Sequence, residues 1–257
     1  MNNKKWKGWN SPDDSNQLYI DVCSQASVDD NVFSKFKSIQ AYKNVLEHVL
    51  EDQGSWYLKT ILEMTNDLND NLEEFKENDK YGNPSVNDYT GIGRISPTTL
   101  RYIKNSFDMA SLVKETPISR IVEVGGGYGG LCKTLSVICD FDEYILIDLP
   151  EVIKLQDRYL SNFPDLHKKC VFVPCTESEE VKDVDLFISN YALSECDDET
   201  QAMYFDNLIS NSKFAYLVYN VVNFREYKLE NFIKKLQEIF TVTTSQDLEN
   251  VVLYSKR

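Results

Sequence analysis

The sequence has no long hydrophobic run, few basic residues and only two histidines. No segment approaches the ~18–20 apolar residues of a membrane-spanning helix, and no apolar stretch follows the lysines near the start, as it would in a secretory signal. Lysine and arginine number 27 against 41 aspartates and glutamates, for a net charge of −14. Nucleic acid binding requires a basic surface, so we expect a cytoplasmic protein with no nucleic acid partner and no membrane span.

Cysteine spacing also excludes a class of site. The six cysteines include no Cys-x-x-Cys pair, the spacing expected of a zinc or redox motif. We therefore expect buried, reduced thiols, as in a reducing compartment. The length of 257 residues allows one large domain or a domain with a sizeable extension.

One segment carries most of the functional information, the run Arg120-Ile-Val-Glu-Val-Gly-Gly-Gly-Tyr-Gly-Gly130. Its first half predicts a buried parallel strand, and the glycines follow where a helix must begin. Glycine permits positive φ and leaves no Cβ between backbone and ligand. A second predicted strand, 143–148, ends in Asp148, whose carboxylate can accept hydrogen bonds from two ribose hydroxyls. The pattern predicts a nucleoside-binding crevice; a glycine turn without a ligand is the alternative, but such a turn needs no acid on the next strand.

The glycines fit both a dinucleotide pattern and the S-adenosylmethionine pattern Glu123-x-Gly125-x-Gly127-x-Gly129. Glu123 favours S-adenosylmethionine, because a carboxylate there can hold the ammonium of a methionine moiety and would repel a pyrophosphate. Two predicted C-terminal strands, 239–244 and 250–255, also suit the reversed last strand of methyltransferases better than another strand–helix unit. The remaining expected cofactor contacts are Leu149 on the adenine, Cys175 and Thr176 along its edge, and Asn190 and Arg101.

The chain is expected to divide near residue 115. Residues 1–115 form an N-terminal helical cap and lid loop, with apolar residues at helical spacing over 33–49 and 56–76. A glycine- and tyrosine-rich loop over 78–93 has the length of a lid, and Ser96-Pro97 begins a third helix. Residues 116–257 form the cofactor-binding domain.

That second part alternates strands and helices, which predicts an α/β fold with a parallel sheet covered on both faces. We expect a Rossmann-like class I methyltransferase sheet of seven strands, the last antiparallel. The expected strands cover residues 120–124, 143–148, 170–174, 185–189, 214–219, 239–244 and 250–255. The expected helices between them cover 129–139, 151–162, 198–210 and 229–239.

Four segments together resemble the bacterial sugar O-methyltransferases associated with capsule and other surface-polysaccharide gene clusters. They are Ser96-Pro-Thr-Thr-Leu-Arg-Tyr-Ile103, Ile121-Val-Glu-Val-Gly-Gly-Gly-Tyr-Gly-Gly130, Ile147-Asp-Leu-Pro-Glu-Val152 and Leu186-Phe-Ile-Ser-Asn-Tyr-Ala-Leu-Ser-Glu195. The resemblance covers the chain from about residue 81 to its end. It implies methyl transfer to a hydroxyl of a sugar or nucleotide sugar in surface-polysaccharide biosynthesis, with S-adenosylhomocysteine as product.

A sugar hydroxyl is a poor nucleophile until its proton is removed, so a base is expected beside the methyl group. Glu195 is the first candidate, because it follows the fourth strand by a few residues. It could instead stabilise the start of a helix, or join Asp197 and Asp198 in holding Mg²⁺. Nothing in the spacing requires a metal, and we predict none.

Several other residues are candidates. Tyr128 could contact the cofactor or the acceptor, or could pack in the core. His48, on a predicted cap helix, is a second possible base. His167 is expected at the far end of the sheet. Arg101 and Arg94 could hold the methionine carboxylate or an acceptor phosphate, or form surface ion pairs.

Two further functions stay open from the sequence. The chain could methylate another small polar group of the same polysaccharide pathway, or bind the cofactor without turnover as a partner protein. It could also form a homodimer.

Overall fold

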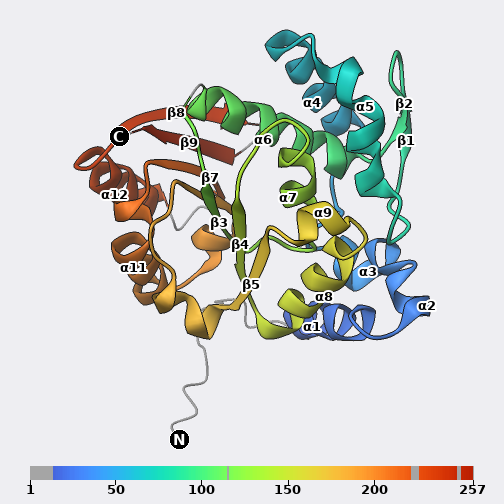
Figure 1. Ribbon diagram of the computed structural model, residues 1–257, viewed down its shortest axis with the longest axis horizontal. Helices are drawn as coiled ribbons and strands as arrows, with labels where there is room; N and C mark the ends of the chain where they lie inside the picture. The colour runs from blue at the N-terminus through green and yellow to red at the C-terminus, as the bar shows by residue number, and fades with distance from the viewer. Residues whose placement is uncertain (1–13, 115, 221–225, 248–249, 257) are drawn as a thin grey trace, which may run out of the picture.

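The sheet at the centre of the molecule has seven strands in the order β5-β4-β3-β6-β7-β9-β8 (Figure 1). The computed structural model describes residues 14–114, 116–220, 226–247 and 250–256. Five neighbouring strands are parallel: β3 (Arg120–Val124), β4 (Glu143–Asp148), β5 (Cys170–Pro174), β6 (Leu186–Asn190) and β7 (Phe214–Asn220). The last strand, β9 (Asn250–Lys256), is antiparallel to β7 and to β8 (Thr241–Asp247). The predicted α/β fold with a parallel sheet is confirmed.

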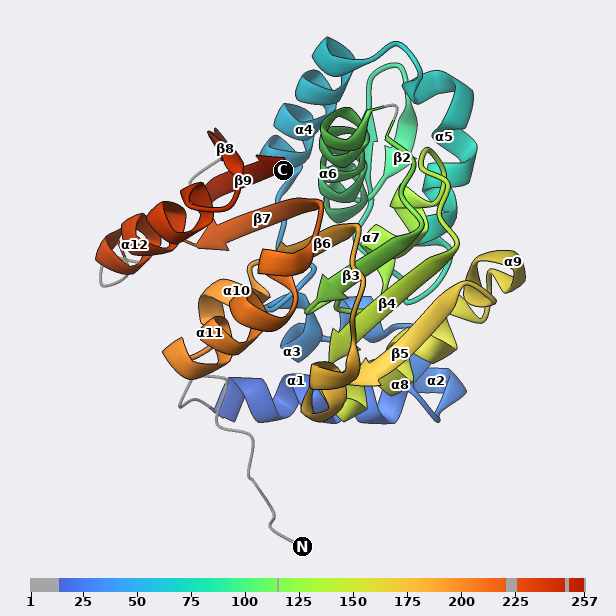
Figure 2. The same ribbon diagram turned by 60° about the vertical axis from the view of Figure 1, so that its left-hand side comes forward.

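Helices cover both faces of the sheet. Successive side chains of a strand point to opposite faces, so each strand packs against both helical layers. Ile121 packs on one face and its neighbour Val122 on the other. Figure 2 shows the two helical layers. The first includes α6 (Pro97–Val113), α7 (Gly130–Leu135) and α8 (Pro150–Leu160); the second includes α10 (Ala192–Glu195), α11 (Asp198–Asn207) and α12 (Glu226–Gln237). A short helix, α9 (Pro164–His167), precedes β5. No helix of the described residues is long and apolar enough to cross a membrane.

The N-terminal region begins with α1 (Asp14–Ala26), which packs along α8 and passes beneath the ends of β4 and β5 in Figure 2. The predicted helix over 33–49 is wrong. It is replaced by α2 (Asp30–Phe33), a 3-10 turn (Phe36–Ser38) and α3 (Gln40–Lys43). The backbone N–H of Lys37 donates to the carbonyl oxygen of Gly82 at 2.9 Å, so that it cannot continue a helix from Phe33.

The predicted helical face over 56–76 divides into α4 (Glu51–Met64) and α5 (Leu68–Lys76). The break comes where the N–H of Asp67 bonds the hydroxyl of Thr65 at 3.0 Å. The segment expected as a loop over 78–93 contains a hairpin of β1 (Asn87–Tyr89) and β2 (Gly93–Ile95). The predicted start of α6 is confirmed, with Ser96 accepting a bond from the N–H of Thr99 and Pro97 in the first turn.

Asn78, fully buried, joins these N-terminal elements to the sheet domain. Its amide nitrogen donates to Thr99 at 2.7 Å and to the Tyr128 hydroxyl at 2.9 Å, and its amide oxygen accepts from Tyr159 at 2.7 Å. Its backbone oxygen accepts a bond of 2.7 Å from the buried ammonium of Lys37.

Apolar residues from both sides of position 115 also form one buried cluster. Tyr42 and Tyr102 belong to it together with Leu131 and Tyr216. Helices α1, α2, α3 and α6 therefore share a core with the sheet, whereas α4 and α5 pack with α6 in a separate cluster. A division into two domains at residue 115 stays a prediction.

We expect Asn78→Ala to lower the free energy of unfolding by about 3 kcal/mol, because it leaves several buried polar groups unsatisfied. Urea unfolding followed by circular dichroism measures the change. Asn71→Ala is the matched control, because the Asn71 side chain donates only locally, to the backbone oxygen of Asp67 just before α5, and its loss should cost under about 1 kcal/mol. Equal stability of the two variants would contradict the role of Asn78.

Candidate functional site

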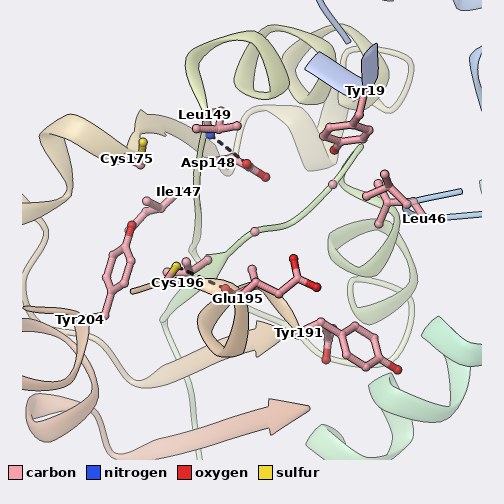
Figure 3. Close-up of a pocket in the computed structure, with 16 residues that line it drawn as sticks. Tyr19, Leu46, Ile147, Asp148, Leu149, Cys175, Tyr191, Glu195, Cys196 and Tyr204 are labelled. Atoms are coloured by element: carbon pink, nitrogen blue, oxygen red, sulfur yellow. Dashed lines mark hydrogen bonds between the residues drawn. The ribbon is translucent and has the colours of Figure 1, made fainter. Parts of the chain in front are cut away.

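A pocket with a free volume of about 120 Å³ lies at the carboxyl ends of β3, β4 and β6 (Figure 3). This is the edge where open α/β sheets bind ligands. Its lining residues come from the ends of these three strands, the turn after β5, the segment after α3, and α1, α10 and α11 with the residues beside them. They are Tyr19, Val45, Leu46, Val124, Gly125, Gly127, Ile147, Asp148, Leu149, Cys175, Asn190, Tyr191, Ala192, Glu195, Cys196 and Tyr204.

The glycine turn after β3 forms the floor of this pocket. Gly125 and Gly127 have φ values of +78° and +58°, in the region that side chains rarely adopt. A Cβ at Gly125 would lie 2.1 Å from the Cβ of Ala192, and one at Gly127 would lie 2.8 Å from a methyl carbon of Leu46. Both positions therefore require glycine on two grounds, backbone conformation and close packing.

Asp148, at the end of β4, brings a carboxylate to the pocket. One oxygen accepts from the N–H of Leu149 at 2.8 Å and the other from the amide of Gln156 at 3.0 Å. Burial raises the pKa of Asp148 to about 7, although hydrogen bonds from Leu149, Gly127 and Gln156 oppose the rise. Gln156 thus orients a carboxylate that the surrounding protein desolvates.

Of the residues expected to contact the cofactor, Leu149, Cys175 and Asn190 line the pocket, while the exposed Thr176 does not. Both polar atoms of the Asn190 amide are buried and have no hydrogen-bond partner in the protein. Buried polar groups are nearly always paired. An orphaned amide on a pocket wall indicates a polar ligand.

Glu123 does not line the pocket. It is 2% exposed and accepts a 2.8 Å hydrogen bond from the Tyr144 hydroxyl. One of its carboxylate oxygens lies 3.0 Å from the position that a Cβ on Gly126 would take, so it supports the glycine turn from behind. Burial raises the pKa of Glu123 to about 7. In this structure Glu123 therefore does not reach the pocket, where the expected contact with the ammonium of a ligand would form.

Glu195 is in the pocket, at the end of α10. Figure 3 shows its carboxylate pointing into the open space between Asp148 and Tyr191. The backbone reaches α10 through Tyr191, whose φ of +70° is unusual for a side-chain-bearing residue. The residue that caps the next helix is Asp197 and not Glu195. The side chain of Asp197 accepts a 2.8 Å bond from the N–H of Thr200 at the start of α11.

The structure separates three predicted site residues from the pocket. Tyr128 is fully buried, and the ammonium of Lys37 lies 3.9 Å from the centre of its ring, so its packing interpretation is the correct one. His48 is exposed and does not line the pocket. Arg101 is 5% exposed, which excludes a surface ion pair; its guanidinium donates to the backbone oxygen of Leu46 at 3.3 Å.

The other candidates lie farther from the pocket lining. Arg94 is exposed on β2, and His167 contacts Asp157 at 2.6 Å. All six cysteines are free thiols, and they are not all buried as predicted, since Cys139, Cys170 and Cys196 are partly exposed. Among the described residues, no group of three or more histidine, cysteine, aspartate or glutamate side chains could hold a metal ion.

The pocket also contains residues that the sequence did not predict. Tyr19 and Leu46 come from the N-terminal region, whereas the 78–93 segment, expected as the lid, contributes no lining residue. That segment is instead tied to the base of α6, where Asp79 accepts bonds from Ser96 and Thr99. The helical spacing of Tyr19, Val22 and Ala26 indicates a buried helix face, but no sequence pattern places it at a site.

No protein-family model matches the sequence, and a search of curated proteins returns no match. Among solved structures, the chain is similar to the mitomycin 7-O-methyltransferase MmcR, with 15% identity and a TM-score of 0.46 over 63% of this chain and 55% of that one. An O-methyltransferase family protein from Burkholderia thailandensis matches with 14% identity and a TM-score of 0.46, over 60% and 57% of the two chains.

The methyltransferase domain of a bacterial Hen1 matches with 11% identity and a TM-score of 0.48, over 59% of this chain and 97% of that domain. The chain thus spans little more than half the length of the first two structures. Similarities of this size identify neither a substrate nor a reaction for this chain.

The raised pKa of Glu123 predicts how stability depends on pH. Because its pKa is about 7 in the folded protein and about 4.3 when unfolded, folding favours the protonated form. This contribution is fully present below about pH 4 and is lost as the pH rises through about 7. Between pH 5 and 8 the parent should lose about 2 kcal/mol more stability than Glu123→Gln. Urea unfolding across this pH range measures the difference, with a variant of the exposed Glu63, Glu63→Gln, as control. The same pH dependence of the free energy of unfolding in all three proteins would contradict the raised pKa of Glu123.

Proposed function

We propose that this chain is an S-adenosylmethionine-dependent O-methyltransferase of the class I fold, acting on a hydroxyl of a sugar. The observation that carries the proposal is the meeting of three features in one pocket: the glycine turn at Gly125–Gly127, the half-buried carboxylate of Asp148 and the carboxylate of Glu195. The sugar is supported by the resemblance of four sequence segments to bacterial sugar O-methyltransferases, and a nucleotide-activated or phosphate-bearing monosaccharide of a surface-polysaccharide pathway is the proposed acceptor.

The lining residues fit the parts of this cofactor. Asp148 would accept hydrogen bonds from the two ribose hydroxyls, with Leu149 and Cys175 beside the adenine. The orphaned amide of Asn190 offers a donor and an acceptor on the same wall, and Gly125 and Gly127 place no side chain between the backbone and the methionine end. A pyrophosphate is a poorer fit, because Glu195 points its carboxylate into the pocket.

Methyl transfer requires the protein to align the acceptor hydroxyl with the methyl group and to provide one proton acceptor. The cofactor supplies a methyl group that its sulfonium already activates. Glu195 would take the proton from the acceptor hydroxyl as the oxygen bonds to the methyl carbon, leaving S-adenosylhomocysteine and a methyl ether. Tyr191 and Leu46, which border the same space, would exclude water and hold the acceptor in line with the methyl group.

Asp148→Ala should weaken S-adenosylhomocysteine binding at least tenfold, because it removes two charge-assisted hydrogen bonds of roughly 1.5–3 kcal/mol each. Isothermal titration calorimetry measures the affinity. Asp157→Ala is the matched control, since Asp157 lies on the same helix as Gln156 but contacts His167, and it should bind like the parent. Unchanged affinity in Asp148→Ala, or tight binding of NAD by the parent, would overturn the cofactor assignment.

Glu195→Gln should lower kcat on the order of 10²–10⁴-fold, the usual worth of a general base, while affinity for S-adenosylhomocysteine stays nearly parental. Methyl transfer to a panel of nucleotide sugars gives kcat. Asp197→Ala is the control for a structural effect; it should cost about 1 kcal/mol of stability through loss of the helix cap and leave kcat near the parental value. Parental turnover in Glu195→Gln would exclude Glu195 as the base.

A further inference from the structure

Two N-terminal side chains close the pocket on the side opposite Cys175 and Tyr204 (Figure 3). Tyr19 comes from α1 and is 4% exposed, and the half-buried Leu46 comes from the irregular segment after α3. Neither residue stands on the sheet. We call Tyr19 and Leu46, with the intervening chain, the roof of the pocket.

The free volume beneath the roof is too small for the ligand that the proposed function requires. It is about 120 Å³, whereas pockets for ligands of this size usually measure about 300–1,000 Å³. Gly125, Asp148 and Asn190 follow or end strands that pair side by side in the sheet. The floor is therefore rigid, whereas the roof stands on no strand, so displacement of the roof is the route that best provides space for a ligand.

Each roof residue covers one part of the floor. Leu46 packs directly on the glycine turn, since its methyl carbon lies 2.8 Å from the position that a Cβ on Gly127 would take. Tyr19 lies over the other part of the floor, at Asp148 (Figure 3). Burial raises the pKa of the Tyr19 hydroxyl, and the charges of Cys23 and Asp148 raise it further. A ligand that bonds Asp148 and extends along the glycine turn passes beneath both side chains.

The roof is held firmly at its two anchor points. The guanidinium of Arg158 on α8 donates to the backbone oxygen of Ala26 at the end of α1, at 3.0 Å. Lys37 is bound through its ammonium to the Asn78 carbonyl at 2.7 Å and through its N–H to Gly82 at 2.9 Å. At Leu46, by contrast, the bond from Arg101 measures 3.3 Å, beyond the usual range for a strong hydrogen bond.

We propose that Tyr19 and Leu46 form a ligand-gated roof: the segment around Leu46 opens to admit the cofactor and closes on it, with the Tyr19 hydroxyl beside the ribose. This inference rests on the proposed function. It assigns to the N-terminal region, rather than to the 78–93 segment, the control of entry and release.

The test measures S-adenosylhomocysteine binding and release by stopped-flow fluorescence, with melting temperatures to verify folding. Leu46→Ala should raise the dissociation rate about tenfold, because it removes the apolar cover, and leave the association rate equal or faster. Tyr19→Phe keeps the buried ring and should weaken binding about fivefold through loss of one hydrogen bond. Leu62→Ala and Tyr81→Phe are matched controls outside the pocket lining, expected to behave like the parent.

Hydrogen exchange provides a readout that does not depend on turnover. The N–H of Leu46 bonds the carbonyl of Tyr42 at 3.1 Å, and its exchange should slow when S-adenosylhomocysteine binds, with less protection in Leu46→Ala. The gating proposal would be overturned, and the proposed function retained, by the following result. The parent binds S-adenosylhomocysteine, hydrogen exchange over 42–50 does not change, and both roof variants keep parental dissociation rates. A parent that does not bind S-adenosylhomocysteine would overturn both.

Discussion

The close packing of α10 and of the Leu46 segment on the glycine turn is the constraint on which the rest of the site depends. Gly125 lies against Ala192 of α10 and Gly127 against Leu46, with no room for a Cβ at either position. This contact determines where α10 starts, and therefore where Glu195 points. It also determines how near the N-terminal segment comes to the sheet.

Buried polar groups connect that close contact to the rest of the molecule. Lys37, Asn78 and Arg101 are each at most 5% exposed, and each bonds the backbone or side chain of a segment distant in sequence. Desolvation lowers the pKa of Lys37, which is the cost of burying an ammonium. The hydrogen bond to Asn78 and the face of the Tyr128 ring offset that cost. The chain from residue 33 to 50, whose own backbone bonds form short turns, is thus also tied to distant segments by specific polar contacts.

The sequence predicts the sheet and the strand-end residues well, because their signals are local. A β-branched run, a glycine turn and an acid at the next strand end are read directly from neighbouring residues, and Asp148, Asn190 and Glu195 all line the pocket. The sequence fails where long-range contacts override periodicity. Residues 33–49 have helical spacing, yet the bond from Lys37 to Gly82 breaks the helix. Tyr128 and Glu123 lie within the correct motif, but their side chains point into the core, which the motif alone does not reveal.

The proposed function requires that one nucleoside ligand lie across Asp148 and the glycine turn. The most direct test is a crystal structure of the protein with S-adenosylhomocysteine. We expect the ribose hydroxyls on the Asp148 carboxylate, the amino-acid end along Gly125–Gly127 and the sulfur facing Glu195. Density for the ligand at any other place, or a ribose that does not contact Asp148, would contradict it.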